Sequence, residues 1–205
     1  MKLEDFKLYL PKFLSAESEK ELFDGLKDFP NNIDTRLYSN YLTETDIIFQ
    51  GDGISDMLYV NLPNPDIKPV PSMILSNTCD IDIHNVRNFP SQVVYAPIFN
   101  LTKYQDALYN KSEKTKEQID SHIQSIKNQE ITQIFYLPEV DSKIKDSIVF
   151  FDRVCNLPNK SISRDNLKEK RLFTLSDYGA YLFILKMSIH FTRIQDKVER
   201  KSVNL

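Results

Sequence analysis

Between Ile47 and Asn85, short apolar runs are separated by glycine, proline, asparagine and aspartate, and this pattern restricts the folds open to the chain. Apolar runs of this length, bounded by turn-forming residues, are typical of short strands joined by tight loops. A further run, QVVYAPIFNL at 92–101, is rich in β-branched and aromatic residues, which favour strands. We therefore expect a small β-domain rather than a parallel sheet alternating with helices.

Other segments have helical patterns. Residues 15–29 place apolar side chains on one face of a short amphipathic helix. Residues 102–129 are rich in lysine and glutamate with isoleucines at helical spacing, which predicts a solvated helix inserted between strands. Strand-like runs return in ITQIFYLPEV and DSIVFFDRVCNL, and a long apolar helix follows, with Ser176 as its N-cap. That last helix must lie across the β-domain or in a dimer interface.

The predicted fold class is α+β with a mainly β core. Residues 1–46 form an N-terminal helical extension packed on that core. Residues 47–205 form the core itself, with a helical insertion at about 102–130 and a C-terminal helix at about 176–198.

Composition excludes several classes of protein. The 205 residues carry a formal net charge of −3, which gives no global attraction to nucleic acid, so any such surface must be local. Cys79 and Cys155 form neither a disulfide framework nor a paired metal signature, and the N-terminus lacks the apolar core of a signal peptide. Lys186 and His190 interrupt the most apolar segment, so we expect no membrane span. The cysteines and the N-terminus together favour a cytoplasmic location. The sequence contains no glycine-rich nucleotide-binding motif, and we expect no cofactor.

The polar run SNTCDIDIHN at 76–85 admits three interpretations. Cys79 could act as a nucleophile with His84 as base and Asp80 or Asp82 orienting it. Asp80, Asp82 and His84 could instead bind a metal ion. The third interpretation is a turn followed by a strand, in which Cys79 is a small buried residue pointing away from His84. We favour a contact surface and predict no metal site.

Several stretches, taken in order, resemble the PemK/MazF family of SH3-like barrels, whose best-known members are ribonuclease toxins of bacterial toxin–antitoxin pairs. The matching stretches are QGD with LYVNLPNP, KPVPSMILSN, VVYAPIFNL, DSIVFFDRVCNL and the closing helix. The resemblance covers about 50–101 and 131–190, and it implies an SH3-like barrel to which the other helices are additions.

The chain departs from the family pattern at the catalytic positions. Active members use an arginine before the proline of the second strand and a threonine or serine after the aliphatic-proline segment of the third. Val70 and Phe99 stand at these positions here. Lys68 could substitute for the arginine from two residues upstream, but its ammonium group cannot make a planar two-pronged phosphate contact. Either a rearranged site cleaves RNA, with Asp80 or His84 moving protons and Lys68 or Arg87 holding phosphate, or the barrel only binds.

The sequence thus predicts a prokaryotic toxin–antitoxin or phage-defence protein that binds RNA or a protein partner such as an antitoxin, as a monomer or homodimer. The rivals are a non-enzymatic interaction module and a thiol hydrolase using Cys79. Arg153 is assigned either to RNA or to a carboxylate of a partner, or else to an ion pair, which is local with Asp152 or formed across strands. The residues predicted to bind RNA or a partner are Lys68, Asn77, Thr78, Asp80, Arg87, Asn100 and Arg153.

Overall fold

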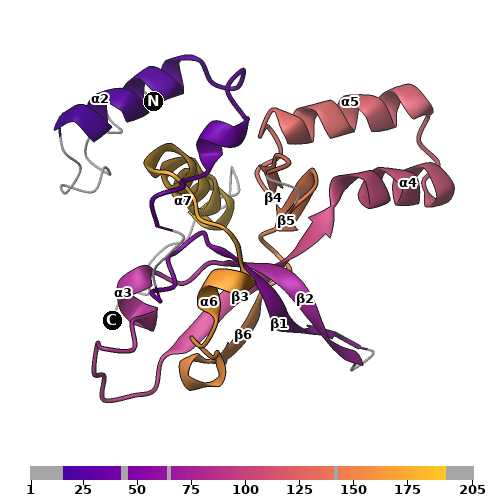
Figure 1. The fold of residues 1–205 in the computed structure, drawn as a ribbon. Coiled ribbons are helices and arrows are strands. Elements are labelled where there is room, and N and C mark those ends of the chain that lie inside the picture. Colours follow the sequence, from indigo (N-terminus) through magenta and orange to yellow (C-terminus); the bar gives the residue numbers. More distant parts are fainter. Residues whose placement is uncertain (1–15, 43–45, 64–65, 141–142, 193–205) are drawn as a thin grey trace, which may run out of the picture.

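The computed structural model describes residues 16–42, 46–63, 66–140 and 143–192. In these ranges an antiparallel sheet is surrounded by helices (Figure 1), so the predicted α+β class is confirmed. The strands are β1 (Gly53–Asn61), β2 (Asp66–Ile74), β3 (Gln92–Asn100), β4 (Ile134–Leu137), β5 (Ser147–Phe150), β6 (Cys155–Pro158) and β7 (Arg171–Phe173). The helices are α2 (Ala16–Lys27), α3 (Thr78–Ile81), α4 (Leu101–Lys111), α5 (Lys116–Lys127), α6 (Leu167–Lys170) and α7 (Asp177–Thr192), with 3-10 turns η1 (Thr35–Leu37) and η2 (Asn159–Ser161).

The sheet has the strand order β4-β5-β3-β2-β1-β7, and β6 pairs with β3 on the same side as β5. The segment predicted as one late strand is therefore two, β5 and β6, separated by a turn at 151–154. Among the described residues the strands form an open sheet and do not close into the predicted barrel. Two prolines in β2, Pro69 and Pro71, lack the N–H groups that further strand pairing would need.

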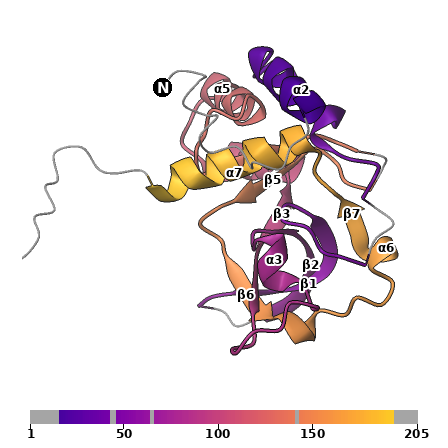
Figure 2. The same ribbon diagram turned by 90° about the vertical axis from the view of Figure 1, so that its left-hand side faces the viewer.

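The core lies between the sheet and α7, which crosses the strands (Figures 1 and 2). Phe183 of α7 packs against Phe135 and Phe151, with ring centroids 5.5 Å and 5.9 Å apart. The backbone N–H of Gly179 donates to Ser176 Oγ at 3.1 Å, which confirms the predicted N-cap. The helix is described as far as Thr192, and the remainder of the predicted helix, 193–198, lies outside the described residues.

The N-terminal segment packs on the same core. Leu22 of α2 and Leu37 of η1 are buried together with residues of the sheet and α7. Gly179 allows a close approach at this point, because a Cβ atom there would lie only 2.2 Å from the carbonyl oxygen of Leu37. Residues 1–15 of the predicted extension lie outside the described residues.

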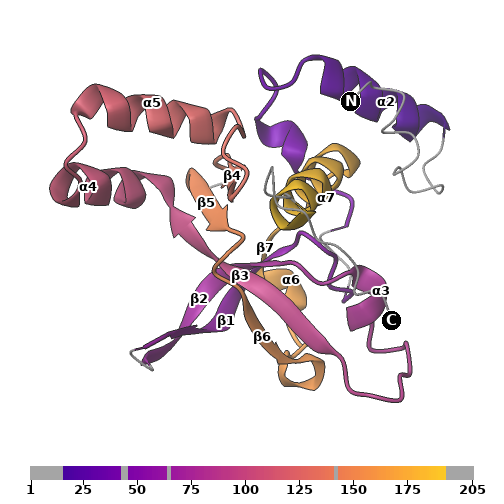
Figure 3. The same cartoon turned by 180° about the vertical axis from the view of Figure 1, so that it is seen from behind.

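The insertion at 102–129 is a helical hairpin and not the predicted single helix. α4 begins directly after β3, and Thr115 starts α5 with a capping box in which its side chain and that of Gln118 each accept a backbone N–H. This cap stabilises a second helix start, which breaks the polar segment in two. The hairpin extends to one side of the sheet (Figures 1 and 3).

No helix in the described ranges is both long and apolar enough to cross a membrane.

Candidate functional site

The loop that carries the polar run 76–85 begins with α3. The side chain of Asn77 accepts the backbone N–H of Cys79 at 2.9 Å and so caps this short helix. The predicted strand alternation of Asp80, Asp82 and His84 is therefore wrong, because residues 78–81 are helical. Cys79 is exposed, so its prediction as a buried residue is wrong too. Thr78 Oγ1 accepts the N–H of Gln50 at 3.0 Å and ties the loop to the sheet.

Charged side chains in this loop pair with one another. His84 Nδ1 lies 3.1 Å from Asp82 Oδ1. The backbone N–H of His84 donates a hydrogen bond to the same carboxylate, and this bond lowers the pKa of Asp82. Arg87 donates to Asp80 Oδ1 at 2.6 Å and to the carbonyl oxygen of Cys79 at 3.3 Å. The Asp82–His84 contact is the one predicted for an orienting carboxylate, but in the described part of the chain no hydrogen bond joins His84 to Cys79. Within the described ranges, no three His, Cys, Asp or Glu side chains are placed to hold a metal ion.

The other predicted binding residues lie elsewhere. Lys68 is on β2 opposite Tyr59, in a hairpin on the other side of the sheet from α3 (Figures 1 and 3). Asn100 caps α4 by accepting the N–H of Lys103 at 2.9 Å. It lies at the far end of β3 from the 76–91 loop, and a nine-residue strand is roughly 25–30 Å long. The predicted joint surface of Lys68, Arg87 and Asn100 is therefore not formed.

A second surface surrounds Arg153, in the turn between β5 and β6. Its guanidinium carbon lies 4.4 Å from the ring centroid of Phe150 and 5.0 Å from that of Phe99. In the described ranges Arg153 forms neither the local ion pair with Asp152 nor a cross-strand ion pair. Asp152 instead accepts a hydrogen bond from the side chain of Gln133. Arg153 is instead held by cation–π contacts with two rings that pack edge to face, 5.6 Å apart.

The helical hairpin adds two polar groups to this surface. Tyr104 of α4 packs edge-on against Phe150 at 5.7 Å, and its hydroxyl lies 3.1 Å from His122 Nε2 on α5. Burial lowers the pKa of His122, which favours the neutral form of its imidazole. Burial also raises the pKa of Tyr104, while the charge of Arg153 opposes that rise. We call Phe99, Tyr104, His122, Phe150 and Arg153 the aromatic–arginine cluster.

The cluster has the properties of an anion-binding surface. Arg153 is exposed, and among the described residues no carboxylate lies within ion-pair distance of it. A guanidinium stacked on rings keeps a fixed plane, and its N–H donors match phosphate oxygens. Phe99 is only half-buried and presents part of a ring beside that charge. Guanidinium groups and partly exposed rings of this kind are the groups that contact phosphates and bases in proteins that bind single-stranded nucleic acid.

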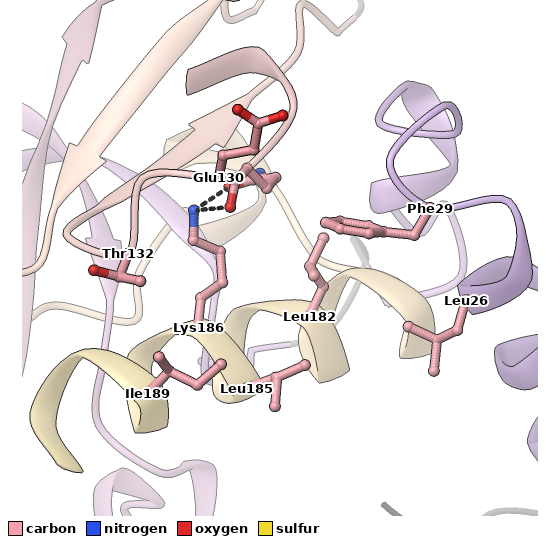
Figure 4. Close-up of a pocket in the computed structure, with 9 residues that line it drawn as sticks. Leu26, Phe29, Glu130, Thr132, Leu182, Leu185, Lys186 and Ile189 are labelled. Atoms are coloured by element: carbon pink, nitrogen blue, oxygen red, sulfur yellow. Dashed lines mark hydrogen bonds between the residues drawn. The ribbon is translucent and has the colours of Figure 1, made fainter. Parts of the chain in front are cut away.

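An apolar cavity of about 390 Å³ lies between the end of α2, the turn at 129–132 and α7 (Figure 4). Lys186 reaches from α7 into its polar end, and its ammonium group donates to Gln129 Oε1 at 2.8 Å and to the carbonyl oxygens of Gln129 and Ile131 at 3.0 Å and 2.9 Å. The carbonyl oxygen of Ile134 is a further acceptor. These oxygen atoms accept the hydrogen bonds that the ammonium group can donate, so none is left for a substrate. We therefore assign Lys186 a structural role and not a catalytic one.

Comparison of the chain with protein-family models and with curated proteins finds no match.

Sequence reasoning identified Arg153 but missed Tyr104, His122 and Phe150. The signal that would have found two of them is the Thr115–Gln118 capping box, since a second helix start predicts a helical hairpin. A hairpin brings side chains of α4 and α5 face to face, as in the Tyr104–His122 pair. No sequence pattern pointed to Phe150, which comes from a separate strand.

Proposed function

We propose that the protein binds single-stranded RNA at the aromatic–arginine cluster. The observation that carries this proposal is the exposed guanidinium of Arg153, stacked on Phe99 and Phe150, with no ion-pairing carboxylate among the described residues. Proteins that bind single-stranded nucleic acid combine such cations for phosphate with aromatic rings for bases. A local site of this kind is needed in a chain with a net charge of −3.

The PemK/MazF resemblance supports binding more than cleavage. Phe99 stands where active members have a catalytic hydroxyl, and in this chain it contributes a ring to the cluster. Val70 replaces the arginine of the second strand and cannot stabilise charge on a phosphate. We therefore propose a divergent, RNA-binding relative of this family, acting in a toxin–antitoxin or phage-defence setting in the cytoplasm.

Replacing Arg153 with alanine is expected to weaken RNA binding at least about tenfold, because one phosphate contact and one stacking partner are lost together. The measurement is fluorescence anisotropy with an end-labelled, mixed-sequence single-stranded RNA in EDTA at several salt concentrations. The dependence of log Kd on log salt should become shallower by about one phosphate contact. Arg153→Lys should recover only part of the affinity, because an ammonium lacks the planar stacking surface.

Arg36→Ala is the matched control. Arg36 is also an exposed arginine, but it is ion-paired with Asp34 at 2.8 Å and lies outside the cluster. Its removal should leave the affinity unchanged, and an equal loss in both variants would refute a local site. The same RNA, recovered and mapped after incubation in EDTA, should be intact. Defined cleavage would show that the chain is a ribonuclease with a rearranged site.

A further inference from the structure

His122 is the member of the aromatic–arginine cluster to which RNA binding by a cation and rings gives no role. Its Nε2 atom lies 3.1 Å from the hydroxyl oxygen of Tyr104, and the centroids of the two rings are 6.1 Å apart. Tyr104 packs edge-on against Phe150, and the ring of Phe150 carries the guanidinium group of Arg153. Two aromatic rings therefore connect His122 of α5 to Arg153 in the turn after β5.

A proton on His122 would add a second positive charge to the cluster. In the part of the chain that the structure describes, no Asp or Glu side chain lies within ion-pair distance of His122 or of Arg153. His122 is half-buried, so water solvates its ring only in part. A charged imidazole is costly in such a place, and an anion bound beside it lowers that cost.

The surroundings of His122 disfavour its protonation in the free protein. Burial lowers the pKa of His122, and the charge of Lys114, in the connection between α4 and α5, adds to this effect. The charge of Arg153 extends as far as Tyr104, whose pKa it lowers against the effect of burial. Phe150 of β5 carries no charge. These groups leave His122 able to accept a proton once negative charge is brought to the cluster.

The other charged side chains of the helical hairpin and the turn supply no counter-ion for His122. Asp120 of α5 is bonded to Gln105 and Tyr109, and Asp152 is bonded to a glutamine side chain. The charged residues of α4 are exposed, and in the described ranges none forms an ion pair or hydrogen bond with His122: Lys103, Asp106 and Lys111. A phosphate of a bound RNA can therefore take the role of counter-ion.

We propose that His122 is a second cation of the RNA site, and that binding of RNA at Arg153 is accompanied by uptake of a proton at His122. This inference rests on the proposed RNA binding and adds to it a residue and a dependence on pH. The polyanion stabilises the imidazolium, and by linkage the protonated protein binds RNA more tightly. Protonation also makes Nε2 a donor to the hydroxyl oxygen of Tyr104, and this charge-assisted hydrogen bond holds the two rings together.

Fluorescence anisotropy at low salt, at pH 8 and at pH 5.5, tests this coupling. The probe is an end-labelled oligouridylate, because uracil does not titrate between these pH values. The Kd of the wild-type protein should fall about fivefold as the pH is lowered, which is the size of effect expected for one charge near a few phosphates. His122→Gln removes the titrating group, so it should lose most of this pH dependence and keep the affinity measured at pH 8.

His84→Gln is the matched control. His84 is exposed, lies in the 76–91 loop and pairs with Asp82 at 3.1 Å, so this variant removes a histidine outside the cluster. It should keep the pH dependence of the wild-type protein. An equal loss of pH dependence in the two variants would mean that the overall charge of the protein sets it, and would overturn the proposal.

An NMR titration of the histidine rings supplies a second measurement, which needs no variant that folds. The chain has 3 histidines, and their signals are followed against pH with and without the RNA. Bound RNA should move the His122 transition to higher pH and leave that of His84 in place. An unmoved His122 transition, together with RNA binding that Arg153→Ala weakens, overturns this inference alone. A wild-type protein that binds no RNA overturns both proposals.

Discussion

Replacing Arg171 with methionine is expected to lower the free energy of unfolding by about 3–5 kcal/mol, the range found when one partner of a buried ion pair is removed. Arg171 and Asp52 are almost fully buried, and Arg171 Nε donates to Asp52 Oδ2 at 3.1 Å. The same guanidinium donates to the carbonyl oxygens of Leu42, at 3.0 Å, and Ile47. One side chain thus joins β7 to the segment before β1. Urea denaturation followed by circular dichroism measures the loss.

The pH dependence of this loss has a definite sign. Burial raises the pKa of Asp52 to about 6, and Arg171 is among the groups that limit the rise. Between about pH 4 and 6 the native carboxyl binds a proton that the unfolded chain does not, so its contribution to stability falls as the pH rises through this window. Without Arg171 the pKa of Asp52 rises further. The Arg171→Met variant should therefore lose less stability at pH 5 than at pH 8.

Two controls isolate the buried pair. Arg36→Met removes an arginine from the exposed pair with Asp34 and should cost less than about 1 kcal/mol. The double variant Asp52→Leu, Arg171→Met removes both buried charges and should be more stable than Arg171→Met alone. If the double variant is instead the less stable of the two, the buried carboxylate is not the source of the loss.

Much of the fold could be predicted because its signals are local. The turn residues between 47 and 85 indicated short strands, which are β1 and β2, and Ser176 indicated the start of α7. Closure of the sheet could not be predicted, because it depends on pairing between strands far apart in the sequence. β7 was missed for a similar reason, since its three residues are recognisable only through their pairing with β1.

The candidate site was less predictable than the fold. The run at 76–85 was predicted to form a site because its polar residues are adjacent in sequence. In the structure its charged side chains pair with one another within the loop. The aromatic–arginine cluster combines side chains from β3, α4, α5, β5 and the following turn. No spacing of residues in the sequence predicts that these side chains lie together in the fold. Arg153 could be chosen as a candidate, but its neighbours could be known only from the fold.

Replacing Lys186 with methionine is expected to lower the free energy of unfolding by about 3 kcal/mol at pH 9, because buried acceptors lose their donor. Only 5% of Lys186 is exposed, and at pH 9 its side-chain amine is the hydrogen-bond donor to oxygen atoms of Gln129, Ile131 and Ile134. Figure 4 shows the side chain directed from α7 toward the turn that carries Glu130. Methionine keeps the apolar stem but supplies no donor. Lys103→Met, at an exposed position of α4, is the control and should change stability by less than about 0.5 kcal/mol.

The cost of the Lys186→Met substitution should depend on pH. Burial lowers the pKa of Lys186 to about 7, whereas an unfolded lysine keeps its usual value of about 10.5. Between these values the unfolded chain binds more protons than the native protein, so wild-type stability rises with pH from about 7 to 10. The variant has no such group, and its loss relative to wild type should therefore be larger at pH 9 than at pH 7. An equal loss of stability at pH 7 and pH 9 would contradict this prediction. It would mean that Lys186 stays charged at both pH values, because its hydrogen bonds to carbonyl oxygens raise its pKa by as much as burial lowers it.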